Sequence, residues 1–192
     1  MVRTMRWFHF RIGWLNLWIL ALVVFATPIL VNRIRGERGK AGLARATAFP
    51  AMSAVERVFY MLVMAPQFVM PLYTVFVPFT ANAALLGAGL ALFVIGQAWR
   101  IKSTWDYTSS PSGELITHGV YRLSRNPGYF GATLVYLGMG LAGGSWLIVA
   151  IAVYWFIGYQ WVATVEERFC VEQWPDEFPE YKRQVAKNFL FF

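Results

Sequence analysis

The chain has 192 residues, of which 58% are hydrophobic and only 14% charged, with a formal net charge of +7. Soluble domains carry about 25% charged residues, so this composition excludes an ordinary soluble domain and favours a protein whose solvent is the lipid bilayer. The basic excess does not indicate nucleic acid, since no nucleic-acid-binding motif is present and basic segments beside membrane spans contact anionic headgroups.

Three long windows without Asp, Glu, Lys or Arg divide the chain: residues 12–32, 58–99 and 126–165. A helix crosses the roughly 30 Å hydrocarbon layer in about 20 residues, so the first window predicts one span and each of the others two. The apolar runs are continuous, which favours helices over a barrel. The sequence therefore predicts an all-α, multi-pass integral membrane protein with a single membrane domain over 1–192 and five spans, at 12–32, 58–78, 83–99, 127–143 and 146–165.

The charge distribution predicts how these spans are oriented. Fourteen of the 17 Lys and Arg residues and all ten Asp and Glu residues fall in 33–57, in 100–125 and after residue 165, which five crossings bring to one side. Basic residues near span ends are retained in the cytoplasm, so this face and the C-terminus are expected to be cytoplasmic and the N-terminus outside. A signal peptide is the alternative for 12–32, but the run exceeds the usual ~7–15 residues and no small-x-small cleavage site closes it.

Two segments of the charged face, residues 100–126 and 166–192, are longer than the topology requires. The first contains a long connection rich in Ser, Gly and polar residues, and such loops are commonly functional. The second mixes acidic and aromatic residues, which predicts an amphipathic helix at the membrane surface. Both are therefore candidate functional segments.

Polar and small residues are densest between His118 and Gly131. Pro127 suits the first position of a helix and Asn126 suits its N-cap, so a helix is expected to begin here and enter the membrane. The amide-rich N-terminus of that helix favours an anion, and Arg125 adds a fixed positive charge. Lipid headgroups are an equally good explanation of this arginine.

Glu166 and Glu167 lie where the last predicted span leaves the membrane. Adjacent carboxylates at this boundary repel each other and are costly to desolvate, so a cationic partner is expected. Arg122, Arg125 and Arg168 are the structural candidates. A ligand ammonium is the functional alternative.

Other motifs favour structural roles. Residues 138–143 match the G-x-G-x-x-G pattern of dinucleotide sites, but no strand precedes them, so these glycines are expected to let helices approach closely. A metal site is not expected, since the chain has only two histidines. The single Cys170 excludes an intramolecular disulfide, and its role is open.

A family resemblance is carried by four short motifs: Gly119-Val120-Tyr121, Arg125-Asn126-Pro127-x-Tyr129-x-Gly131, Glu166-Glu167 and Phe178-x-x-Tyr181. Together they resemble the isoprenylcysteine carboxyl methyltransferases and the related phospholipid methyltransferases. The resemblance extends over roughly residues 90–192. It implies S-adenosylmethionine as cofactor, S-adenosylhomocysteine as product, and a cofactor pocket formed by the last spans, the loop before them and the C-terminal tail.

The resemblance also implies a set of cofactor-binding residues: Gly113, Glu114, Leu115, Ile116, His118, Gly119, Tyr121, Arg125, Asn126, Pro127, Gly128, Tyr129, Glu166 and Glu167. Arg125 and Glu167 are the candidate catalytic residues. Two departures from the family pattern matter. Asn126 stands where the family often has histidine, and residues 160–162 lack the arginine that eukaryotic members use for the substrate carboxylate.

The leading hypothesis is methylation of the C-terminal carboxylate of a prenylated cysteine. A carboxylate with a pKa of about 3.3–3.7 is already a nucleophile at neutral pH and needs no general base. The alternative is a phospholipid N-methyltransferase, whose acceptor amine must first lose a proton, for which Glu167 is a candidate if burial raises its pKa. An NADPH-dependent reductase of the sterol-reductase type and a non-enzymatic scaffold are less favoured.

The expected partners are the lipid bilayer and a lipophilic methyl acceptor, either a prenylcysteine or a phospholipid, with no nucleic acid and no metal. The sequence fixes neither the physiological acceptor nor the oligomeric state.

Overall fold

The computed structural model describes residues 5–46, 51–110 and 113–188, and within them the chain is all-α, as predicted. The last four residues of the expected 166–192 segment lie outside the described residues. The described part contains two isolated β-bridges and no strand. Its elements are α1 (Trp18–Ile34), α2 (Glu37–Ala46), α3 (Ala54–Thr74), α4 (Ala83–Tyr107), the 3₁₀ turn η1 (Gly119–Arg122), α5 (Pro127–Ala142), α6 (Trp146–Gln173) and α7 (Glu177–Gln184).

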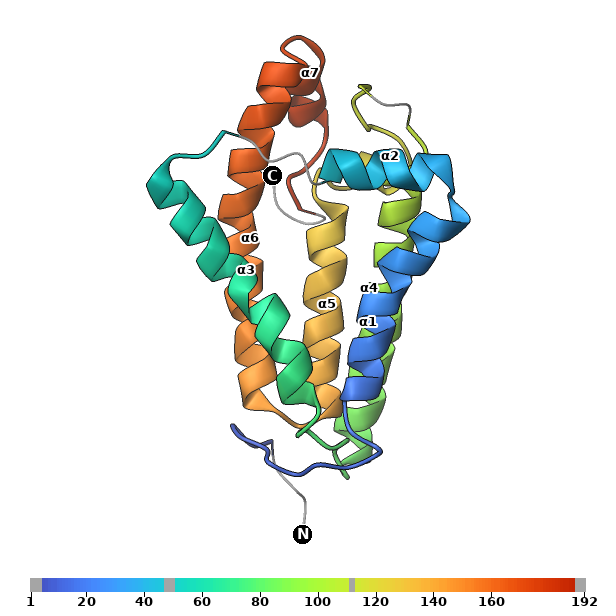
Figure 1. Ribbon diagram of the computed structural model, residues 1–192, viewed down its shortest axis with the longest axis vertical. Helices are drawn as coiled ribbons and strands as arrows, with labels where there is room; N and C mark the ends of the chain where they lie inside the picture. The colour runs from blue at the N-terminus through green and yellow to red at the C-terminus, as the bar shows by residue number, and fades with distance from the viewer. Residues whose placement is uncertain (1–4, 47–50, 111–112, 189–192) are drawn as a thin grey trace.

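The five longest helices form an elongated bundle in which successive members run in opposite directions (Figure 1). Helices α2 and α7 lie at one end, together with the connection from α4 to α5. The N-terminal segment and the short turns from α3 to α4 and from α5 to α6 lie at the other end (Figure 1). The segments that carry most of the charge therefore share one end of the bundle.

Two helices of the described residues, α4 with 25 residues and α6 with 28, are long and apolar enough to cross a membrane. Helix α1 is apolar but shorter, at 17 residues. This pattern is consistent with a membrane protein. The count of five spans and their orientation remain predictions.

Helices α4 and α6 both continue beyond the span limits expected at residues 99 and 165. In α4 the added turns are stabilised by an ion pair between Lys102 and Asp106, four residues apart on one face. Helix α6 has no break at the acidic pair, so Glu166 and Glu167 lie within it and not beyond its end. Their side chains are therefore held by a rigid element.

Helix α3 begins at Ala54 and ends at Thr74, four residues earlier at each end than the expected span. The early start follows from a capping box. The Ser53 hydroxyl accepts from the backbone N–H of Glu56 at 3.3 Å, and the Glu56 carboxylate accepts from the backbone N–H of Ser53 at 2.9 Å.

Helices α4 and α5 pack closely through glycines. A Cβ on Gly89 would lie 2.4 Å from the backbone nitrogen of Ala142, and a Cβ on Gly138 would lie 2.5 Å from that of Phe93. Gly140 faces α6 instead, where a Cβ would lie 2.9 Å from the backbone nitrogen of Val149. The glycines of 138–143 therefore serve close helix packing, as expected, because only a missing side chain lets two backbones approach this far.

Candidate functional site

A cavity of about 590 Å³ lies at the charged end of the bundle. Its wall is formed by residues of α2 to α7 and of the connection between α4 and α5. The volume falls within the ~300–1,000 Å³ that is typical of small-molecule sites. The fold thus gathers segments that are far apart in the sequence around one cavity.

Most residues of the predicted site lie in the wall of this cavity. They are Glu114, Leu115, Ile116, Tyr121, Arg125, Asn126, Pro127, Gly128, Tyr129, Glu166 and Glu167. The structure therefore brings the loop motif and the acidic pair together, although about forty residues separate them in the chain. Their contact with a cofactor stays a prediction.

Three predicted residues, Gly113, His118 and Gly119, lie outside the cavity wall. The carbonyl of Gly113 accepts a 2.9 Å hydrogen bond from the Trp174 indole, which fixes the loop against the end of α6. Gly119 has a φ of +60° and packs so closely on the Asp106 carboxylate that a Cβ would lie 2.0 Å from it. These two glycines shape the loop, and only a glycine fits the second position.

Helix α5 begins at Pro127, with Asn126 in the N-cap position, as predicted. The expectation that the Asn126 side chain caps the helix is wrong. Its amide instead donates to the carbonyl of Lys187 at 3.2 Å, and its backbone N–H is bound by the Ser124 hydroxyl at 3.1 Å. Asn126 therefore ties the start of α5 to the C-terminal tail, a partner that no local pattern reveals.

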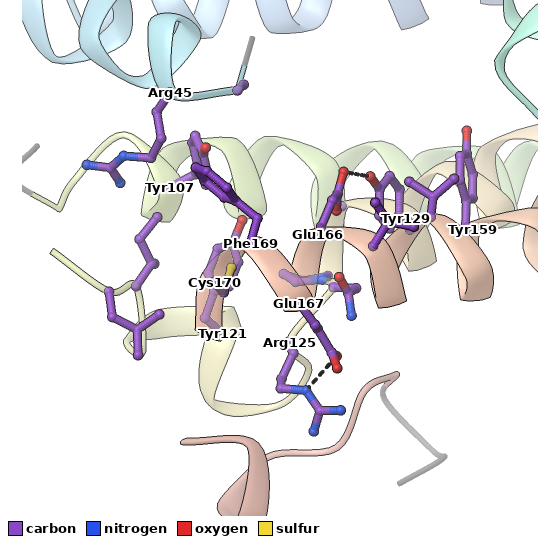
Figure 2. A pocket seen from close by; sticks show the side chains of 18 of the residues that line it. Arg45, Tyr107, Tyr121, Arg125, Tyr129, Tyr159, Glu166, Glu167, Phe169 and Cys170 are labelled. Atoms are coloured by element: carbon purple, nitrogen blue, oxygen red, sulfur yellow. Dashed lines mark hydrogen bonds and ion pairs between the residues drawn. The ribbon is translucent and has the colours of Figure 1, made fainter. Parts of the chain in front are cut away.

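The two adjacent glutamates have different partners, because successive residues of a helix point about 100° apart. Glu167 is buried and accepts from Arg125 Nε at 3.0 Å and from Lys182 Nζ at 3.0 Å. Glu166 accepts a 2.5 Å hydrogen bond from the Tyr129 hydroxyl. Figure 2 shows the two carboxylates directed to opposite sides, one toward Arg125 and the other toward Tyr129.

Of the two adjacent glutamates, only Glu167 has the expected cationic partner. Within the described residues no ion pair involves Glu166. Arg168, one of the three structural candidates, pairs instead with Glu56 of α3 at 2.9 Å. Glu166 is therefore a carboxylate on the cavity wall whose partner in the described chain is a neutral phenol.

Arg125 joins three segments. Beyond Glu167 on α6, its guanidinium donates to the carbonyl of Lys182 at 3.0 Å and to that of Val185, and its backbone N–H donates to the carbonyl of Ala186 at 2.9 Å. A further tail residue, Lys187, donates to the carbonyl of Gln160 at 2.7 Å. Burial lowers the pKa of the Lys187 ammonium. These contacts hold the tail against α6 beside the cavity.

Aromatic rings line much of the cavity. Tyr129 and Tyr159 stack with 4.4 Å between ring centroids, and both line the wall beside Glu166 (Figure 2). The Tyr181 hydroxyl donates to the carbonyl of Tyr121 at 2.6 Å, which links α7 to the loop. Burial raises the pKa of the Tyr121 phenol, so it stays neutral at physiological pH.

Several wall residues belong to none of the sequence motifs. Examples are Arg45, Tyr60, Gln67, Arg100, Thr104, Tyr107, Tyr159, Phe169, Cys170 and Trp174. Most of these are aromatic or apolar residues, for which a place in a cavity wall and ordinary packing give the same sequence pattern. Arg100 could have been singled out from the sequence, because it is the charged residue that ends the 42-residue apolar window 58–99.

The described part of the chain holds no group of three or more His, Cys, Asp or Glu side chains arranged to bind a metal ion. The expectation of a metal-free site remains a prediction.

Comparison with known families gives a match to the phospholipid methyltransferase family over residues 78–177, just over half of the chain. This stretch holds α4, α5, α6 and the connection with η1, which form most of the cavity wall. Comparison with curated proteins gave no match.

Proposed function

Because the chain belongs to the phospholipid methyltransferase family, we propose that it uses S-adenosylmethionine to methylate a lipophilic acceptor in the cavity at the charged end of its bundle. The family indicates a membrane methyltransferase and shares a superfamily with the isoprenylcysteine carboxyl methyltransferases. The cofactor, the acceptor and the residues that bind them are the proposal.

The observation that carries this proposal is Glu166, a carboxylate on the cavity wall with no ion pair to a described residue. A carboxylate in such a place favours a cationic ligand. S-adenosylmethionine carries an α-ammonium and a sulfonium, and its α-carboxylate suits the amide-rich N-terminus of the 16-residue helix α5. The residues present therefore fit the cofactor by charge as well as by volume.

In this arrangement Glu166 holds the cofactor ammonium, and the Tyr129 hydroxyl fixes the orientation of that carboxylate. Gly128, the second residue of α5, leaves the helix N-terminus open to an anion, with the Ser103 hydroxyl as the nearest neighbour of an added Cβ, at 3.6 Å. Arg125, Glu167 and Lys182 keep the tail in place beside the cavity. When bound, S-adenosylmethionine supplies an electrophilic methyl group to the acceptor.

The family favours a phospholipid amine as the first candidate acceptor. The carboxylate of a prenylcysteine is the second, and a specific observation favours it. Glu167 is neutralised by Arg125 and Lys182, so it is a poor base for an ammonium that must lose a proton. A carboxylate acceptor needs positioning only.

Substitution of Glu166 tests the cofactor site. In purified full-length protein, calorimetry is expected to show binding of S-adenosylhomocysteine that Glu166→Gln weakens by roughly tenfold to a hundredfold, because a hydrogen bond to a charged group is lost. Glu172→Gln is the matched control, since it removes an exposed carboxylate of α6 outside the cavity wall. It is expected to leave binding within about twofold.

Two results would contradict the proposal. Binding of NADPH in place of S-adenosylhomocysteine would favour the reductase alternative. Equal binding by the wild-type protein and Glu166→Gln would remove this carboxylate from the cofactor site.

A further inference from the structure

Arg100 is a charged residue of the cavity wall to which neither the sequence motifs nor the family match gives a role. It lies on α4, seven residues before the helix ends, so roughly two turns separate it from the loop at the charged end. Thr104, about one turn further along the same face of α4, also lies in the cavity wall. Arg100 thus brings a positive charge into the part of the cavity that lies between the helices.

Few groups of the described residues offset the positive charge of the Arg100 guanidinium. Its one hydrogen bond there is donated to Gln97 Oε1 at 2.7 Å, and no ion pair involves it. The nearby ionisable groups that act on it are the phenols of Tyr136 and Tyr159, which are neutral at physiological pH. A guanidinium has five N–H donors, so most of its binding capacity is left for a ligand.

The neighbouring helix is built to admit the Arg100 side chain. A Cβ on Gly131 of α5 would lie 2.8 Å from Arg100 Cγ and 3.1 Å from the carbonyl oxygen of Gly96. The missing side chain at Gly131 therefore lets the arginine stem pass α5. A charge removed from water in this way is costly unless an anion meets it.

We propose that Arg100 binds the anionic oxygens of the methyl acceptor, either the phosphodiester of a phospholipid or the carboxylate of a prenylcysteine. This inference rests on the proposed function and names the acceptor subsite within the same cavity. Both groups are oxyanions that an arginine fork can bind with two parallel hydrogen bonds.

The position of Arg100 favours the acceptor over the cofactor. Gly131 lies four residues into α5, about one turn from the helix N-terminus where the cofactor carboxylate is placed. Arg100 lies beside Gly131 of α5 and near the phenols of Tyr136 and Tyr159, within the helical part of the bundle. Glu114 and Asn126, in contrast, line the cavity from the connection between α4 and α5. A lipid that enters between helices meets the Arg100 side of the cavity, and a water-soluble cofactor enters from the loop end.

The stacked tyrosines of the cavity wall connect Arg100 with Glu166. Tyr159, which feels the charge of Arg100, stacks on Tyr129, and Tyr129 donates to Glu166. Arg100 and Glu166 are thus linked through one stacked tyrosine pair, and both line the same cavity. One cavity therefore offers a cation for the acceptor and a carboxylate for the cofactor.

The test uses full-length protein in lipid nanodiscs and three variants. Arg100→Gln removes the charge and keeps a polar side chain, and Arg100→Lys keeps the charge without the fork. Arg57→Gln is the matched control, because Arg57 is an exposed basic residue near the same end of the bundle and is not part of the cavity wall. Methyl transfer is measured separately with phosphatidylethanolamine and with farnesylcysteine, and binding of S-adenosylhomocysteine is measured alongside.

Arg100→Gln is expected to raise KM for the acceptor by about tenfold or more, because charge-assisted hydrogen bonds are lost. Its affinity for S-adenosylhomocysteine is expected to stay within about twofold of the wild-type value. Arg100→Lys is expected to recover part of the loss, and Arg57→Gln to behave like the wild-type protein. The acceptor that shows turnover and the KM effect identifies the oxyanion as phosphodiester or carboxylate.

Unchanged KM in Arg100→Gln, or weaker binding of S-adenosylhomocysteine in that variant, would overturn the inference. Direct binding of the two acceptors, with diacylglycerol as an uncharged reference, keeps the test independent of turnover. If the wild-type protein binds no S-adenosylhomocysteine, the proposed function fails. In that case acceptor binding that Arg100→Gln loses still supports the Arg100 assignment, and acceptor binding that it retains refutes it.

Discussion

At the scale of single residues, the largest change from the sequence interpretation concerns Arg125 and Glu167. The resemblance made them candidate catalytic residues, and both lie in the cavity wall. Their charged groups are directed at each other and at the tail, with side-chain exposures of 7% and 8%. We infer that the pair positions the tail beside the cavity, and that Glu166 and Arg100 are two wall charges available to ligands.

The cost of breaking this pair is the first expected outcome at this scale. Arg125→Ala leaves Glu167 buried beside Lys182 alone, and removal of one partner from a buried pair costs about 3–5 kcal/mol. We expect a marked fall in thermal stability together with faster proteolysis of the tail after α6. The Arg168→Ala variant, which breaks a more exposed pair with Glu56, is expected to cost at most about 1 kcal/mol.

A catalytic role for Arg125 predicts a different pattern. Arg125→Ala would then abolish methyl transfer while thermal stability and tail proteolysis stay at wild-type values.

At the scale of helices, the sequence located α5 by its first residue, because Pro127 has no N–H to lose and its fixed φ suits a helix start. The expected span limits do not coincide with the helix ends. Helices α4 and α6 continue past their apolar runs, since a helix ends where its hydrogen bonds end and not where its hydrophobicity ends. Loss of apolar character marks a predicted membrane boundary and says little about the helix itself.

The close contact of α4 with α5 gives an expected outcome for two glycines. Gly138→Ala places a Cβ 2.5 Å from the backbone nitrogen of Phe93, which can move only if the helices separate. We expect destabilisation by about 1–3 kcal/mol, as for other overpacked sites. Gly87→Ala on α4 meets nothing within 4 Å and is expected to be neutral or to stabilise by up to about 1 kcal/mol.

Thermal unfolding of both variants in the same detergent measures this difference. Equal stability of the two alanine variants would show that α4 and α5 do not depend on glycine for their contact.

At the scale of the whole molecule, the predicted topology can be checked by labelling. In a Cys170→Ser background, Ala81→Cys in the α3–α4 turn and Glu172→Cys near the end of α6 are exposed positions separated by three predicted spans. With the N-terminus outside, a membrane-impermeant maleimide applied to intact cells is expected to label Ala81→Cys, and Glu172→Cys only after permeabilisation. Labelling of both positions from one side would contradict an odd number of crossings between them.

The sequence alone determined the all-α class, the membrane environment and the motifs of the family, because apolar run length, charge position and turn chemistry act locally along the chain. Only the tertiary structure decided the partners. It gave Glu166 and Glu167 different partners, and it showed that the Asn126 side chain contacts the tail and does not cap α5. It also placed Arg100 in the cavity wall. Charge partners and cavity walls join side chains from different helices, and their choice depends on how those helices pack, which spacing along one chain does not encode.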